Sequence, residues 1–163
     1  MKSRKIKTLA QLKPIVARLK KRGKRIVLAN GCFDLFHVGH VRYLRSARNR
    51  GDVLVVALNS DASVRALKGP GRPIMGQAER AEILAAFECV DYVTIFDDPN
   101  VERILLALKP DVHAKGSDYT IDSVPERETV KSYGGEIYIA GGPKVRSTRD
   151  VVKKIAAGRA RHG

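Results

Sequence analysis

Five short apolar runs alternate with helical stretches along almost the whole chain, and this alternation constrains the fold more than any other feature. The Val- and Ile-rich runs are residues 26–30, 53–58, 92–95, 112–115 and 136–139. The stretches with helical character are 8–22, 40–50, 61–68, 77–88, 100–108, 124–132 and 147–157. Short buried strands that alternate with helices predict βαβ crossovers and a parallel sheet with both faces covered.

We therefore expect an α/β protein with a Rossmann-like, doubly wound, parallel five-stranded sheet flanked by helices. The 163 residues fit one domain, 1–163, with an N-terminal helix at 8–22 and a basic tail at 158–163.

Ligands of doubly wound sheets bind beyond the carboxyl ends of the strands, where the strand order reverses. This places the expected chemistry in the loops that follow Ala29, Leu58, Lys115 and Ile139.

The net charge of +14 is concentrated at the two ends of the chain. Residues 1–25 hold eleven Lys and Arg and no acid, and residues 144–163 hold seven and one acid. The body, 26–143, has thirteen bases and sixteen acids, a net charge of −3. Basic ends are often only solvated, and an aromatic content of 6% offers no stacking series for bases. A nucleic-acid-binding module that uses the basic tails is therefore the weaker alternative.

Three features of the sequence indicate where the protein works in the cell. No apolar run approaches the ~20 residues that a membrane-spanning helix needs, and the basic N-terminus continues into an amphipathic segment unlike a secretion signal. Cys32 and Cys89 have no framework spacing, which suits a reducing compartment. We expect a cytoplasmic protein without a membrane partner.

The loop after the first strand carries the sharpest motif. His37 and His40 stand three residues apart with Gly39 between them, where a strand gives way to a helix. A helix N-terminus offers unpaired amides to a phosphate, and Gly39 lets the phosphate approach the backbone. Imidazoles there can donate hydrogen bonds to a reacting phosphoryl group. Alternatively, one histidine caps the helix and the other is packed. A zinc pair is disfavoured because no Cys or His cluster supplies a third ligand.

Residues 31–40 resemble the signature of the cytidylyltransferase-like nucleotidyltransferases. Within that family the chain is most similar to the adenylyltransferases that make ADP-heptose from heptose 1-phosphate. The further similar segments are 25–34, 59–63, 67–69 with 72–73, 115–119 and 134–136, in order and with similar spacing. The resemblance implies transfer of AMP from ATP to a sugar 1-phosphate with release of pyrophosphate. A cytidylyltransferase acting on glycerol 3-phosphate or a similar alcohol phosphate is the alternative of the same chemistry.

The resemblance also implies roles for individual residues. The catalytic residues would be His37, His40 and Lys68. The nucleotide would be bound by Cys32, Phe33, His37, His40, Arg80, Lys115, Gly116, Arg146, Ser147, Thr148 and Arg149. The phosphorylated sugar would be bound by Asp34, Lys68, Arg72 and Asp118. Mg²⁺ would be held mainly by the nucleotide phosphates rather than by protein ligands, and relatives suggest a homodimer.

Several of these residues have a structural alternative. Asp34 could brace its loop by accepting hydrogen bonds from local amides, and Arg80 could form an exposed ion pair with a neighbouring acid such as Glu79. His113, near the end of the fourth strand, is expected to be packed rather than catalytic. Arg149 stands where the family usually has a hydroxyl residue, and we expect its guanidinium to contact the triphosphate instead.

Overall fold

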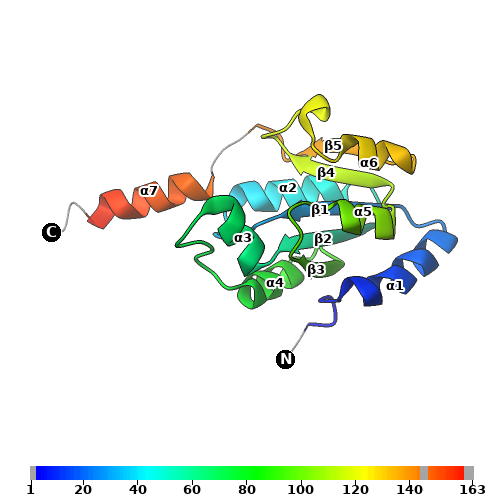
Figure 1. Cartoon of the computed structure of the whole chain (residues 1–163), viewed down its shortest axis with the longest axis horizontal. Helices are drawn as coiled ribbons and strands as arrows, with labels where there is room; N and C mark the ends of the chain where they lie inside the picture. The colour runs from blue at the N-terminus through cyan, green and yellow to red at the C-terminus, as the bar shows by residue number, and fades with distance from the viewer. Residues whose placement is uncertain (1–2, 144–146, 160–163) are drawn as a thin grey trace.

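The computed structural model describes residues 3–143 and 147–159 (Figure 1). Arg146, which the sequence assigns to the nucleotide, and residues 160–163 of the basic tail lie outside the described residues.

A five-stranded, all-parallel sheet forms the centre of the fold. Its strands are β1 (Ile26–Gly31), β2 (Val53–Asn59), β3 (Tyr92–Phe96), β4 (Val112–Gly116) and β5 (Glu136–Ala140). The spatial order is β3-β2-β1-β4-β5, so the strand order reverses between β1 and β4. The expected Rossmann-like α/β fold is confirmed, and each strand extends at most one residue beyond its predicted range.

The helices that cover this sheet follow one another along the chain in the predicted order. They are α1 (Leu9–Lys21), α2 (Val38–Arg48), α3 (Asp61–Lys68), α4 (Gln77–Ala86), α5 (Glu102–Leu108), α6 (Arg127–Ser132) and α7 (Thr148–Arg159), with a short 3₁₀ helix, η1 (Ile121–Ser123). The single helix predicted at 124–132 is wrong in its first turn. Val124 is extended (φ −66°, ψ 118°) because Pro125 disfavours the helical conformation of the preceding residue.

Two hydrophobic cores lie on opposite faces of the sheet. Val27 and Ala29 of β1 point into the core under α2 and α4, whereas Ile26 and Leu28 point into the core under α1, α5 and α6. All four residues are fully buried. Since both faces of the sheet are covered, β1 is apolar throughout and does not alternate between apolar and polar residues. Such continuous apolar runs can be recognised in the sequence.

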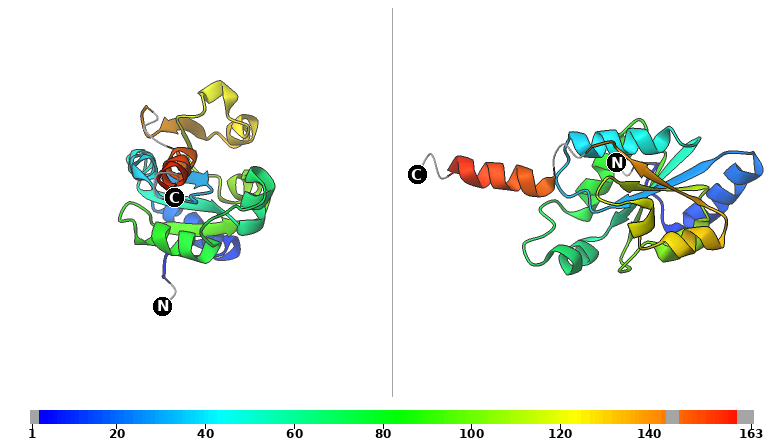
Figure 2. Two further views of the ribbon diagram at one scale, coloured as in Figure 1. Left: turned by 90° about the vertical axis from the view of Figure 1, so that its left-hand side faces the viewer. Right: turned by 90° about the horizontal axis from the view of Figure 1, so that it is seen from above.

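Helix α7 differs from the others because it extends away from the sheet, as two directions of view show (red in Figures 1 and 2). Its first residues remain beside the carboxyl ends of the strands, so only its start can contribute to a site there. Within residues 3–143 and 147–159, none of the helices has the length and apolar character to cross a membrane.

Candidate active site

A cavity of about 450 Å³ opens at the carboxyl ends of β1, β4 and β5. Its walls come from the start of α2, the end of α3, the loops after β4 and β5, and the start of α7. The predicted site residues that the cavity brings together are His37, His40, Lys68, Gly116, Asp118, Ser147, Thr148 and Arg149. These residues come from four separate segments of the chain, and the parallel topology places them at one edge.

His37 and His40 form a stacked pair at the N-terminus of α2, with ring centroids 3.9 Å apart. The Gly39 amide donates to Nδ1 of His37 (3.1 Å), and the His37 amide donates to Nδ1 of His40 (3.4 Å). A ring nitrogen that accepts a hydrogen bond carries no proton, so each ring has its proton on Nε2. The helix cap thereby orients both imidazoles as Nε2–H donors, and the capping and phosphate-binding interpretations are compatible.

The surroundings of His40 favour its neutral form. Its ring lies 5.2 Å from the Phe33 ring and 5.5 Å from the Phe36 ring, centroid to centroid. Burial lowers the pKa of His40 to about 4, followed by repulsion from His37 when that ring is protonated and from the Lys68 charge. At neutral pH His40 is therefore a hydrogen-bond donor without a net charge.

Positive charge in the cavity comes from Arg42, Lys68 and Arg149. In the described part of the chain, no carboxylate lies within ion-pairing distance of any of the three. The acidic side chain in the cavity wall is Asp118. A cavity with this balance attracts an anionic ligand.

The start of α7 is organised by its own side chains. The Ser147 hydroxyl donates to Oδ2 of Asp150 (2.8 Å), and the Ser147 amide donates to the same oxygen (2.7 Å). Thr148 is largely buried, and Arg149 is exposed at the cavity wall. The two hydroxyl residues and the arginine therefore reach the cavity from one helix terminus.

Two parts of the wall were missed by sequence reasoning. Arg42 lies one turn after Gly39 on α2, and this spacing on one helix face was the available signal. Gly141 follows β5 with φ +96°, and a Cβ there would lie 3.3 Å from the Cα of Tyr43. The Tyr43 hydroxyl in turn donates to the Ala114 carbonyl (2.8 Å). Glycine is thus needed where the β5 loop packs against α2.

Asp34 and Arg72 are not in the cavity wall. Asp34 is 1% exposed and accepts hydrogen bonds from the Ile74 amide (2.7 Å), the Met75 amide (3.1 Å) and the Arg72 guanidinium (2.8 Å). Burial alone would raise the pKa of Asp34, but these hydrogen bonds bring it below its ordinary value. The contacts are those of a loop brace, which fastens the segment after α3 to the loop after β1.

Replacing Asp34 with Ala is expected to loosen this segment. Each hydrogen bond to a charged carboxylate contributes about 1.5–3 kcal/mol to the stability of the segment, and the variant loses these bonds. The Ile74 and Met75 amides should therefore exchange at least tenfold faster in native-state hydrogen exchange. Asp98→Ala, which removes the carboxylate of the Asp98–Arg103 pair on an outer loop, is the control. Unchanged exchange together with weaker binding of the ligand that the resemblance assigns to Asp34 would instead give Asp34 a role in substrate binding.

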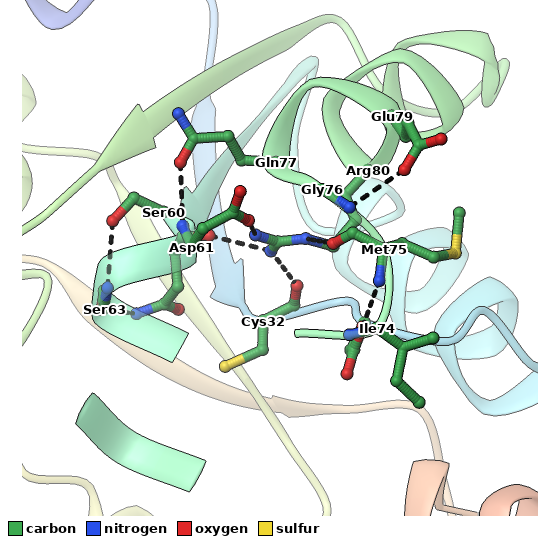
Figure 3. A network of polar contacts seen from close by, with 12 residues as sticks. Cys32, Ser60, Asp61, Ser63, Ile74, Met75, Gly76, Gln77, Glu79 and Arg80 are labelled. Atoms are coloured by element: carbon green, nitrogen blue, oxygen red, sulfur yellow. Dashed lines mark hydrogen bonds and ion pairs between the residues drawn. The ribbon is translucent and has the colours of Figure 1, made fainter. Parts of the chain in front are cut away.

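Arg80 is fully buried, and its guanidinium connects the segments that follow β1 and α3 with the end of β2 (Figure 3). Its guanidinium donates to the carbonyls of Cys32 (2.5 Å), Asn59 (2.8 Å) and Met75 (2.9 Å) and pairs with Asp61 (2.7 Å). The alternative of an exposed ion pair is wrong in two respects: the guanidinium is fully buried, and its acidic partner is Asp61 rather than Glu79, which accepts from the Gly76 amide (3.0 Å). The guanidinium is occupied by protein groups and lies outside the cavity wall.

Three further predicted nucleotide residues, Lys115, Phe33 and Cys32, are not among the residues that line the cavity. Lys115 is 6% exposed and pairs with Glu126 (3.5 Å). Burial lowers the pKa of Lys115, and the Glu126 carboxylate opposes that shift. Phe33 is buried with a left-handed backbone (φ 46°) and supports His40, while the Cys32 carbonyl is taken by Arg80.

His113 is packed, as expected. It is fully buried, and its Nε2 lies 3.0 Å from Oδ1 of Asn30. Burial, followed by the Lys115 charge, lowers the pKa of His113 to about 3.

Comparison with known proteins places this geometry in a family. A family model described as cytidylyltransferase-like matches residues 28–153. The bifunctional protein HldE of Geobacter sulfurreducens is 52% identical over 151 residues, which are 93% of this chain and 31% of that protein. The same protein of Geotalea uraniireducens is 54% identical over 154 residues, again 31% of its length. The chain thus spans about a third of the curated relatives that it matches.

Two solved structures share the fold. The lipopolysaccharide core biosynthesis protein of Thermoplasma volcanium superposes with a TM-score of 0.63 at 25% identity, covering 74% of this chain and all of that one. The pantoate-beta-alanine ligase of Francisella tularensis has a TM-score of 0.63 at 18% identity, covering 88% of this chain and 68% of that one. With its sheet, its stacked histidine pair and a family match across most of its length, the chain belongs to the cytidylyltransferase-like family and is a nucleotidyltransferase.

Proposed function

We propose that this chain transfers AMP from ATP to a sugar 1-phosphate, heptose 1-phosphate, with release of pyrophosphate. The observation that carries the proposal is the cavity in which two Nε2–H imidazole donors meet three cations without carboxylate partners among the described residues. Such a set of groups suits a reaction between two phosphate-bearing substrates.

The relatives support the sugar phosphate as the second substrate. The Thermoplasma protein is named for lipopolysaccharide core biosynthesis, and the HldE proteins match almost the whole chain. The segments at 59–63, 67–69 and 115–119 resemble the ADP-heptose-forming enzymes.

The chemistry is an in-line displacement at the α-phosphorus of ATP. An oxygen of the sugar phosphate forms a new bond to that phosphorus, and the bond to the bridging oxygen breaks, with its electron pair leaving on pyrophosphate. A phosphate nucleophile is already anionic near neutral pH, so no strong general base is needed. His37 and His40 donate from Nε2 to the reacting phosphoryl oxygens, and Lys68 neutralises charge on the incoming phosphate. Catalysis then consists of positioning and charge stabilisation.

Mg²⁺ fits this site as a partner of the phosphates rather than of the protein. Across residues 3–143 and 147–159, no three His, Cys, Asp or Glu side chains gather where they could hold a metal ion. Asp118 is the carboxylate in the described wall. When bound, Mg²⁺ would supply charge neutralisation on the triphosphate oxygens.

The cellular context is part of the same proposal. The enzyme works in the cytoplasm as a homodimer on small-molecule substrates, and the basic ends are solvated rather than bound to nucleic acid. Sedimentation at increasing protein concentration tests the dimer.

The deciding experiment measures pyrophosphate release with ATP or CTP, each against heptose 1-phosphate and glycerol 3-phosphate. We expect Mg²⁺-dependent turnover with ATP and heptose 1-phosphate, and a kcat/KM with CTP lower by at least about tenfold, a discrimination that ~1.4 kcal/mol provides. Faster turnover of CTP with glycerol 3-phosphate would replace the substrate assignment. Absence of turnover in every arm, with tight salt-sensitive binding of nucleic acid, would favour the basic-tail alternative.

A further inference from the structure

Arg42 is a cavity residue to which neither the motif nor the reaction described above gives a role. It is exposed and lies on α2, three residues after Gly39, so both residues face the cavity from one side of the helix. The neighbouring Tyr43 is buried and tied to the Ala114 carbonyl, which fixes this turn of α2 against the sheet. Arg42 therefore projects from a rigid support.

Helix α2, which carries Arg42, packs against β5 and the loop after it. The loop after β5 packs on α2 at Tyr43 through Gly141, and the same cavity wall continues to Arg149 at the start of α7. Lys68 enters the wall from the opposite part of the sheet, at the end of the helix that follows β2. In the order of the sheet, α2 follows β1 and carries both the histidine pair and Arg42, so it lies between Lys68, which follows β2, and Arg149, which follows β5.

Two arginines near Arg42 are neutralised by carboxylates, whereas Arg42 and Arg45 of α2 have none at ion-pairing distance among the described residues, and of these two only Arg42 lines the cavity. Arg48, at the other end of α2, pairs with Asp91 (3.3 Å), and Arg50 pairs with Glu136 (2.9 Å). Within the described residues Arg42 has no carboxylate at ion-pairing distance. Its charge at the cavity wall is therefore available to an anion from solution.

We infer that Arg42 and Arg149 form a clamp for the pyrophosphate part of the nucleotide. The inference rests on the proposed function, in which the entering and leaving groups lie on opposite sides of the α-phosphorus. Pyrophosphate carries two phosphoryl groups and gains the electron pair of the broken bond, so it suits two guanidinium groups, which bind phosphate oxygens in pairs. The incoming sugar phosphate carries one phosphoryl group and suits Lys68.

The test uses inorganic pyrophosphate as the probe and steady-state kinetics beside it. Arg42→Ala should weaken pyrophosphate binding in calorimetry about tenfold or more, the loss expected for a charged hydrogen-bonding group. The KM for ATP should rise in parallel, while the KM for the sugar phosphate stays within about twofold of wild type, because that substrate makes no contact with the lost charge. Arg42→Lys keeps the charge but lacks the paired donors of a guanidinium, so its pyrophosphate affinity should lie between those of wild type and Arg42→Ala.

Arg45→Ala is the matched control, because Arg45 is exposed on the same helix but is not part of the cavity wall. It should bind pyrophosphate as wild type does. Wild-type pyrophosphate affinity in Arg42→Ala, or a rise confined to the KM of the sugar phosphate, overturns the clamp. If wild-type protein turns over no substrate pair yet binds pyrophosphate in an Arg42-dependent way, the proposed function fails and the clamp stands.

Discussion

Replacing His37 or His40 with Ala is expected to lower turnover by about 10²-fold or more, the effect of losing one donor to a transition state that gains charge. The structure adds a complication, because both rings also hold the start of α2 through their Nδ1 atoms. An Ala variant therefore loses a helix cap as well, which costs about 1 kcal/mol. A simple Ala substitution would mix the two effects.

Two conservative variants separate capping from catalysis. Asn is among the preferred N-cap residues, so His37→Asn should keep the cap. Gln at the third helical position can reach back to the N-cap amide, so His40→Gln should keep the reciprocal bond. We expect both to melt near the wild-type temperature and still to lose turnover, since neither amide side chain places an N–H where the imidazole Nε2–H of the histidine lies. Recovery of wild-type turnover in either variant would return that histidine to a purely structural role.

Arg80→Met is expected to have the largest effect on stability. It leaves three carbonyls, of Cys32, Asn59 and Met75, without the fully buried guanidinium that donates to them, and the bond to Asn59 is buried at both ends. An unsatisfied buried polar group costs about 1–3 kcal/mol, so the free energy of unfolding should fall by about 3 kcal/mol or more in urea denaturation. Arg80→Lys should recover part of the loss, because an ammonium can donate but lacks the planar fork.

The matched control is Arg65→Met, which changes an exposed arginine on the neighbouring helix α3 and should shift stability by less than about 0.5 kcal/mol. The resemblance assigns Arg80 to the nucleotide, and the same variants decide that question. Wild-type stability with a raised KM for the nucleotide alone would show that the Arg80 guanidinium binds the ligand rather than stabilising the fold.

Much of the fold could be predicted from the sequence, because a parallel sheet covered on both faces requires apolar strands. β1 and β2 are buried along almost their whole length, and their runs of Val, Ile, Leu and Ala have no competing interpretation. The error near Val124 arose from a local signal, Pro125, that was passed over. Helix starts were predicted less accurately than strands, since α2 begins at Val38 once His37 becomes its cap.

Part of the candidate site could also be predicted from the sequence. His37, His40, Lys68 and Asp118 follow directly from their motifs and the strand-end rule, and the structure gathers them around one cavity. Whether they perform the predicted roles is what the variants above measure.

By itself the sequence determined the order of the elements and the edge of the sheet at which the motifs meet, because both depend on local patterns and one topological rule. Only the tertiary structure decided which polar groups face the ligand. Asp34 meets amides 40 and 41 residues away, and Arg80 meets a carbonyl 48 residues away. Such contacts depend on how loops pack against each other, and a charged side chain has the same local pattern whether it is buried in a brace or open to a phosphate.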